Sequence, residues 1–433
     1  MAQELIQLNT SKLATRVMLI LGLLLATFGS YCALRWYLGS TLAEYFDVDE
    51  GSLDIAKRAQ AFASNDPLAH WTLAEGLRKQ LPADQLGQSL VEYEKAVSLS
   101  PNDYRFWTSY GSVLEQVGDF EKSEYALRQA VKLAPSYAYP HWYLGNLLLR
   151  RSRYDEAFPE LQLACDAEPA FRPQLFSLAS QIYGEDITAL KNAGGSQPGV
   201  TAEFSLYLLA QPNDEIGLRL WNSLSSEEKK ANLSIGQEMV NSLARTKRFR
   251  GAMNVWNDLA PTERYRAKDG LVIDGGFEEN LDYSQEIVFG WQVKPAPQMQ
   301  IAIDPAVAHS GSRSLRLLFQ VRSKLERIDA YQAVPVAPST PYDFECYVRT
   351  EKLQSGSTPM IQIVNAADGT VLATSEPAPN GDSDWNRISL SFKTGEKAEA
   401  VIVKIERASC GDSPMCPIFG AAWYDDFSIK RRD

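Results

Sequence analysis

The hydrophobic and polar positions of residues 101–169 repeat with a period of 34 residues. The repeated positions hold prolines, small residues and leucines, namely Pro101, Pro135 and Pro169; Ala96, Ala130 and Ala164; Gly111 and Gly145; and Leu114, Leu127, Leu148 and Leu161. A fixed period of this length predicts an array of helix–turn–helix units. The small residues let two helices approach closely, the leucines fill the gaps between them, and the prolines close each repeat.

Two copies of one motif lie in register within this array. The motif reads Trp107-x-x-Tyr110-Gly111-x-x-Leu114 in the first copy and His141-x-x-Leu144-Gly145-x-x-Leu148 in the second. The pattern resembles the tetratricopeptide repeat family, with departures at His141, Ser123 and Ser152, where the family prefers Trp, Ala and Gly. The resemblance implies a helical solenoid that binds partner proteins in a concave groove and performs no chemistry of its own.

An uncharged apolar run occupies residues 17–34, after Lys12 and Arg16 and before Trp36 and Tyr37. Its length and its aromatic flank predict a transmembrane anchor helix at 17–38 behind a cytoplasmic tail at 1–16. The basic N-terminal flank predicts that the rest of the chain lies outside the cytoplasm. A cleavable signal peptide and a buried core helix are the alternatives. We favour a retained anchor, because 27–29 is a poor cleavage site.

Helical patterning extends on both sides of the strict period. We expect an acidic spacer at 39–55 and an all-α solenoid at 56–265. Within the solenoid, 56–100 reads as a degenerate first repeat, because Pro67 lies 34 residues before Pro101. Residues 170–262 show apolar positions at helical spacing and are expected to form helix pairs that extend and cap the solenoid.

The patterning changes at Leu271, where short alternating runs separated by turn residues replace helical spacing. The runs include MQIAI, SLRLLFQV, YDFECYVRT, MIQIVN, RISLSFKT and AVIVKIER. Strands at this spacing, with no helices between them, predict an all-β sandwich at 271–433. The whole chain is therefore expected to be multidomain.

A set of motifs in this half follows a recognisable order. The motifs are Asp274-Gly-Gly-Phe277-Glu278, Gly290-Trp291, the run from Ser310 to Leu317, Tyr331-Gln332, Pro341-Tyr342, Tyr347-Val348-Arg349, the run from Trp385 to Phe392, and Trp423-Tyr424-Asp425-Asp426-Phe427. The ordered set resembles the carbohydrate-binding-module jelly rolls found beside bacterial glycanases. The resemblance implies core positions for Trp291, Phe277, Trp423 and Tyr342.

The same resemblance implies a structural calcium ion that ties the first strand to the last. The matching residues are Glu278, Asp425, and Ser312 and Arg313 through the backbone of the Ser310–Arg313 turn. Carboxylate and carbonyl oxygens are the ligands that calcium prefers. The alternative is that Glu278 and Asp425 bond the neighbouring backbone or Arg313 without a metal. Strand alternation predicts that Asp426 points to the opposite face from Asp425.

Sugar binding needs exposed aromatic faces together with amides or carboxylates. The candidates for glycan binding are Tyr331, Gln332, Trp385 and Tyr283. For any one of these aromatic residues, packing in the core is the more common role.

The cysteines and histidines offer less. Cys410 and Cys416 are spaced for a small disulfide loop in an oxidising compartment, and two free thiols are the alternative. Cys165 and Cys346 fall on apolar faces and are expected to be buried singly. The three histidines lie far apart in sequence, and those in the repeats are expected to pack.

Composition excludes some functions. The net charge of -11 argues against a nucleic-acid partner, because phosphate binding needs basic patches. Five cysteines are too few for a disulfide scaffold. The chain has no Gly-rich phosphate loop, zinc-helix motif or nucleophile elbow.

These features together predict a non-enzymatic scaffold in the bacterial inner membrane, crossing it once, with its bulk in the periplasm. The repeats would bind other proteins and the sandwich would bind polysaccharide, in cell-envelope or exopolysaccharide assembly. The first alternative is a subunit of a larger membrane complex that binds only proteins. The second is a glycan-active hydrolase or lyase, for which no catalytic residues are found.

Overall fold

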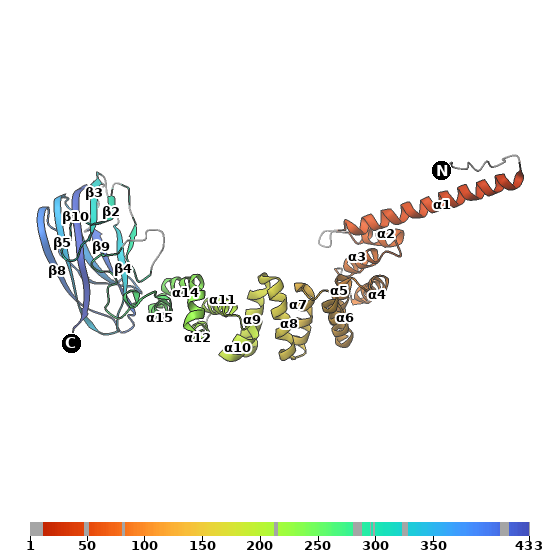
Figure 1. Ribbon diagram of the computed structural model, residues 1–433, viewed down its shortest axis with the longest axis horizontal. Coiled ribbons are helices and arrows are strands. Elements are labelled where there is room, and N and C mark those ends of the chain that lie inside the picture. Colours follow the sequence, from red (N-terminus) through yellow and green to blue (C-terminus); the bar gives the residue numbers. More distant parts are fainter. Residues whose placement is uncertain are drawn as a thin grey trace, which may run out of the picture. The chain divides into compact units, whose positions relative to one another are not determined.

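The computed structural model describes residues 12–46, 52–79, 83–211, 215–279, 288–294, 296–297, 299–322, 328–407 and 415–432. The chain divides into two compact units, Met1–Gly184 and Glu185–Asp433, and each unit is described by itself. Figure 1 labels their elements.

The first unit is helical. Its elements are α1 (Leu13–Glu44), α2 (Leu53–Phe62), α3 (Pro67–Arg78), α4 (Ala83–Leu99), α5 (Tyr104–Gln116), α6 (Phe120–Leu133), α7 (Ala138–Arg150), α8 (Tyr154–Ala167), the 3-10 turn η1 (Pro169–Phe171) and α9 (Arg172–Tyr183). Helices α3–α4, α5–α6 and α7–α8 form successive pairs, and each pair packs on the next (Figure 1). Asp side chains begin three of these helices by accepting backbone N–H bonds, as Asp103 does at α5.

The predicted close approach of paired helices is confirmed. A Cβ added at Gly111 would lie 2.6 Å from Cγ of Leu127, and one at Gly145 would lie 2.6 Å from Cγ of Leu161. Both leucines are fully buried. The period of 34 residues therefore repeats one packing contact, in which a glycine on the first helix receives a leucine from the second.

The first repeat is three residues longer than its neighbours. Trp107 Nε1 donates to the carbonyl oxygen of Pro101 at 2.8 Å, and His70 Nε2 lies 2.8 Å from the carbonyl oxygen of Ser64. Ser64, 37 residues before Pro101, is thus its structural counterpart. The expectation that Pro67 marks the repeat was wrong. The second helices keep the spacing of 34, so the added residues lie between α3 and α4.

The expected spacer at 39–55 is also revised. Helix α1 continues to Glu44, and Gly39 lies so close to α2 that an added Cβ would be 2.6 Å from the backbone nitrogen of Ala63. Ala43 and Ala63 are buried in this contact. The apolar helix thus runs directly into the helical array and packs on its first members.

The second unit begins with helices α10 (Ile187–Gly194), α11 (Pro198–Leu209), α12 (Glu215–Asn222), α13 (Ser226–Ala231), α14 (Leu233–Arg245) and α15 (Phe249–Leu259) and the turn η2 (Glu263–Tyr265). Its strands are β1 (Gln292–Lys294), β2 (Met299–Asp304), β3 (Ser314–Val321), β4 (Asp329–Pro335), β5 (Pro341–Gln354), β6 (Pro359–Asn365), β7 (Val371–Thr374), β8 (Gly381–Lys393), β9 (Ala400–Arg407) and β10 (Ile418–Arg431).

The strands form the predicted β-sandwich. One antiparallel sheet has the order β1-β4-β9-β6-β7 and the other β2-β3-β10-β5-β8. Alternate residues of each strand face a common core, as the burial of β5 shows. Phe277, Trp291, Tyr342 and Trp423 are all buried, so their expected packing is confirmed.

Helices α14 and α15 belong to the sandwich unit, which differs from the predicted boundary at 265–271. The backbone N–H of Arg250, in the first turn of α15, donates to Oε2 of Glu399 at 2.7 Å. The guanidinium of Arg250 bonds the carbonyl oxygen of Val336 at 2.8 Å and Asp269 at 2.7 Å. Phe249 is buried in an apolar cluster that includes Ala333 of β4. These contacts join residues far apart in sequence, so no local pattern announces them.

Candidate functional site

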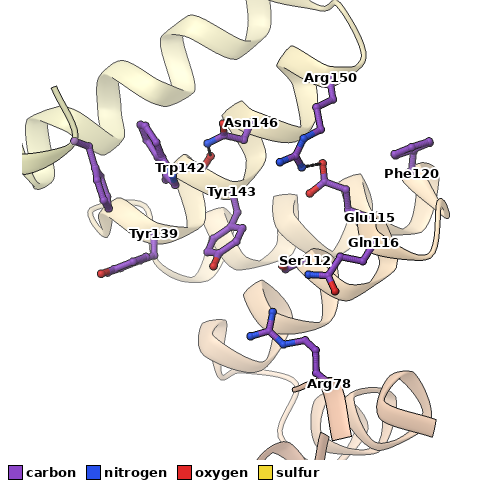
Figure 2. A pocket seen from close by; sticks show the side chains of 11 residues that line it. Arg78, Ser112, Glu115, Gln116, Phe120, Tyr139, Trp142, Tyr143, Asn146 and Arg150 are labelled. Atoms are coloured by element: carbon purple, nitrogen blue, oxygen red, sulfur yellow. Dashed lines mark hydrogen bonds and ion pairs between the residues drawn. The ribbon is translucent and has the colours of Figure 1, made fainter. Parts of the chain in front are cut away.

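A pocket of about 700 Å³ opens among the first helices of the repeats (Figure 2). It is lined by Arg78, Ser112, Glu115, Gln116, Phe120, Tyr139, Trp142, Tyr143, Asn146, Arg150 and Phe171. Most of these residues come from α5 and α7, the first helices of two successive repeats. We call this pocket the groove.

Aromatic side chains form one wall of the groove. The ring of Trp142 stacks on that of Phe171, with centroids 4.6 Å apart and an interplanar angle of 20°. Tyr139 meets Phe171 edge-on at 5.6 Å and remains 61% exposed. Such rings offer contact area whose shape is already fixed by their mutual packing.

Polar groups complete the lining. Glu115 of α5 and Arg150 of α7 form an ion pair, drawn in Figure 2, that neutralises both charges. The Asn146 amide nitrogen donates to the carbonyl oxygen of Trp142 at 2.8 Å. Its side-chain oxygen has no partner in the described part of the chain. The groove therefore presents rings and amides with little net charge, a lining that can receive an extended peptide with apolar side chains.

Sequence reasoning predicted a groove but named none of these residues. A signal was available, because Ser112 and Asn146 each follow the glycine of the repeated motif. Gly111 and Gly145 face the second helix of their pair, and the next residue turns away from it toward the groove. One period thus places successive side chains along the same face.

In the sandwich, the expected calcium ligands gather at the turn of residues 309–313. Oε1 and Oε2 of Glu278 accept bonds from the backbone N–H and hydroxyl of Ser312, at 2.7 and 2.6 Å. Oε1 also accepts the backbone N–H of Arg313 at 3.2 Å. The Ser312 hydroxyl and these N–H groups hold the pKa of Glu278 below its usual value.

Asp425 lies at the other end of this turn and is fully buried. Its Oδ2 accepts the backbone N–H groups of His309 and Ser310 at 2.8 and 3.3 Å. Burial, and then the nearby charge of Asp426, raise the pKa of Asp425.

The prediction that Asp426 points away from Asp425 was wrong. The pairing of β10 with β5 shifts register between Asp425 and Ser428, and Asp426 has a φ of 54°. This β-bulge turns both carboxylates toward one turn. Asp426 accepts the hydroxyl of Ser310 at 2.6 Å and lies 2.6 Å from Nδ1 of His309.

This arrangement does not match a calcium shell. Calcium takes six to eight oxygen ligands, whereas the turn directs N–H groups at Glu278 and Asp425. Among the described residues, no three His, Cys, Asp or Glu side chains form a metal-binding group. The hydrogen-bonded alternative to the metal accounts for both carboxylates, and calcium binding stays a prediction.

The glycan candidates have separate fates. Gln332 is fully buried, and its amide bonds the backbone N–H and carbonyl oxygen of Ile273 at 2.9 and 2.8 Å. It therefore fastens the segment before the sandwich and cannot reach a sugar. Tyr331 and Trp385 are half-buried at the surface, and Tyr283 lies outside the described residues.

Sequence reasoning missed the partners of Trp385. The imidazole of His309 stacks on the ring of Tyr347 at 3.6 Å and meets Trp385 edge-on at 5.6 Å. The Tyr347 hydroxyl donates to Glu345 at 2.9 Å, and Arg387 bonds the same carboxylate at 2.6 Å. Residues from β5, β8 and the 309–313 turn thus form one aromatic cluster.

The described cysteines agree with their expected environments. Cys165 and Cys346 are free and buried, as predicted, and burial raises the pKa of both thiols. Cys416 is disulfide-bonded. Its predicted partner, Cys410, lies outside the described residues.

Comparison with known proteins identifies the repeats. A family model described as Tetratricopeptide repeat matches residues 111–170. The N-terminal half of the chain contains tetratricopeptide repeats. The Small glutamine-rich tetratricopeptide repeat-containing protein 2 of Mycosarcoma maydis is 28% identical over 129 residues, 28% of this chain and 36% of that protein. The chain thus spans about a third of this relative's length.

Two solved structures are similar to different parts of the chain. YrrB, titled a TPR protein with an unusual peptide-binding site, is 14% identical, with a TM-score of 0.26 over 48% of this chain and 92% of its own. A structure titled "CBM4 structure and function" is 13% identical, with a TM-score of 0.28 over 37% of this chain and 100% of its own. At TM-scores below 0.5, neither likeness supports an argument about function.

Proposed function

We propose that this chain is a non-catalytic scaffold whose repeats bind an extended segment of a partner protein in the groove. The observation that carries the proposal is the groove itself: about 700 Å³, with Trp142, Tyr139 and Phe171 packed into one wall. Large rings at the centre of an interface commonly supply most of its binding energy.

The polar lining indicates how a bound segment would be oriented. The side-chain oxygen of Asn146 can accept a backbone N–H of an extended peptide, and the exposed amide of Gln116 can pair with another peptide group. Glu115 and Arg150 already neutralise each other, so the groove selects apolar side chains more than charge.

Site-specific photocrosslinking tests this proposal. A benzophenone amino acid replaces Tyr139 in the groove or, as a control, Tyr125 on α6. Both side chains are 61% exposed, and only Tyr139 lines the groove. In cells, we expect one protein to be captured from position 139 and not from position 125. Equal capture from both positions would contradict binding in the groove.

Membrane anchoring is the second part of the proposal. In the described part of the chain, α1 alone is long and apolar enough to cross a membrane, and a signal sequence would meet the same criterion. Its apolar side chains are exposed. The disulfide at Cys416 favours an oxidising compartment for the second unit. We therefore propose a retained anchor in the bacterial inner membrane, with the units in the periplasm.

Protease treatment of spheroplasts tests the anchor. We expect the full chain to sediment with membranes and to be digested from outside. A soluble chain lacking residues 1–38 would show instead that the apolar segment is removed. Protection of both units in intact spheroplasts would contradict the periplasmic placement.

A further candidate function is glycan contact by the sandwich, as part of cell-envelope or exopolysaccharide assembly. Trp385, half-buried at the surface, lies between the exposed Asp384 and Asn386. An aromatic ring flanked by a carboxylate and an amide suits a sugar. A glycan array tests this with the full chain and the Trp385→Ala variant. Glycan binding that disappears in the variant supports contact there, and binding that persists unchanged contradicts it.

A further inference from the structure

A second pocket, of about 380 Å³, lies where α14 and α15 meet the sandwich within the second unit. It is lined by Asn241, Ala244, Arg245, Lys247, Phe249, Val288, Gln292, Tyr331, Ala333 and Ile402. Its floor is apolar, since Phe249, Ala333 and Ile402 belong to the cluster that joins the helices to the sheet. Its polar members are amides, one phenol and two cations. We call it the junction pocket.

The two cations are held at the pocket by the end of α14. The backbone N–H of Arg248 donates to the carbonyl oxygen of Leu243 at 2.8 Å, and that of Lys247 donates to Ala244 at 3.0 Å. This pair of bonds is a Schellman motif, which places Lys247 in the left-handed region with a φ of 66°. Glycine is favoured there, and a lysine at this position costs backbone energy. Strain of this kind is concentrated at functional positions.

Neither cation is neutralised by an ion pair among the residues that the structure describes. Nε of Arg245 bonds only the carbonyl oxygen of Asn241, at 3.3 Å, and both Arg245 and Lys247 are exposed. In a chain with a net charge of -11, two such cations beside one pocket make a local site for an anion.

We propose that the junction pocket binds a carboxylated pyranose, of the uronic acid type, within an acidic polysaccharide. Arg245 and Lys247 would bond the carboxylate, Tyr331 would pack on the ring, and Asn241 would bond hydroxyl groups. The volume lies within the usual range for small-ligand pockets, about 300–1,000 Å³. The polar groups are few, come from side chains and surround an apolar floor, which suits a compact amphipathic ring. This inference rests on the proposed glycan contact of the second unit, and names its ligand class.

Isothermal titration calorimetry of the detergent-solubilised full chain tests the proposal. The probes are an oligogalacturonate and its methyl ester, which keeps the sugar and removes the charge. We expect the acid to bind about tenfold more tightly than the ester, as charge-assisted hydrogen bonds require. Arg245→Gln and Lys247→Gln should each weaken binding of the acid about five- to tenfold. Tyr331→Ala should weaken binding of both probes.

Lys230→Gln is the matched control, because Lys230 is exposed on α13 and lies outside the junction pocket. It should leave binding unchanged, and equal melting temperatures should show that all variants fold. Equal affinity for acid and ester, or unchanged binding by Arg245→Gln/Lys247→Gln, would overturn the acidic-sugar site. So would an acidic peptide that binds as tightly and responds to the same substitutions. If neutral glycans bind and only Trp385→Ala abolishes this, glycan contact stands and the junction pocket proposal falls.

Discussion

Replacing Gly145 with alanine would add a methyl group where α7 meets α8. The added Cβ would lie 2.6 Å from Cγ and 2.7 Å from Cδ2 of Leu161, and 3.2 Å from the carbonyl oxygen of Ala157. Carbon atoms pack best at about 3.5–4.0 Å, so Leu161 must move by about 1 Å. Leu161 is fully buried and has no free volume to enter.

Two effects of opposite sign decide the outcome. Alanine favours a helix interior over glycine by about 1 kcal/mol. Inserting a methyl group into a packed core costs about 1–3 kcal/mol. Contact with two carbons of Leu161 and a backbone oxygen places this cost at the upper end of that range. The clash therefore wins, and Gly145→Ala should lower the free energy of unfolding by about 2 kcal/mol.

Urea unfolding followed by circular dichroism measures this difference. Gly87→Ala is the matched control, because Gly87 lies in α4 and an added Cβ there meets nothing within 4 Å. It should gain stability, by about 1 kcal/mol or less. Leu161→Ala should cost less in the Gly145→Ala background than alone, because the two substitutions share one contact. A Gly145→Ala chain as stable as the original, or more stable, would refute the proposed close packing.

Three further predictions concern the other sites. Hydrogen bonding to Glu160 raises the pKa of His141 above 6.5, so its stabilising effect is complete below that pH and is lost as the pH rises through the raised value. The difference in unfolding free energy between the original chain and His141→Gln should therefore shrink above pH 6.5, and a constant difference would contradict the pairing. A fragment of residues 185–433 should melt in one transition at a higher temperature than 271–433, because the shorter piece lacks α15; equal melting temperatures would contradict the shared core. If calcium binds at the 309–313 turn, a chelator should lower the melting temperature of the full chain, and an unchanged value would support hydrogen bonding alone.

The sequence predicted features whose cause is local or periodic. The spacing of Gly111 and Gly145 indicated the helix pairs, because one contact with a leucine recurs in each repeat. Alternation indicated the strands, because each faces a single core. The same reasoning failed at Pro67, since a turn three residues longer moves the register without changing the type of fold. It also failed at Asp426, where a bulge reverses the alternation.

Other features depend on contacts that leave no local trace. Arg250 and Glu399 are 149 residues apart and fasten α15 to the sandwich. Gln332 resembled a ligand-binding amide, and only its bonds to Ile273 reveal a structural role. The basic turn at Lys247 was interpreted as a solvated helix end until the sheet was found beside it. In each case the missing information was which segments meet in space.

The measurement that tests the scaffold proposal most directly is the affinity of the groove for its partner. The segment captured by crosslinking at position 139 would be synthesised as a peptide and titrated into the full chain. We expect Trp142→Ala to weaken binding at least about thirtyfold, as loss of a central aromatic residue does. Tyr125→Ala on α6 should leave it unchanged. Equal affinity of the original chain and Trp142→Ala would contradict the proposal that the groove binds the partner.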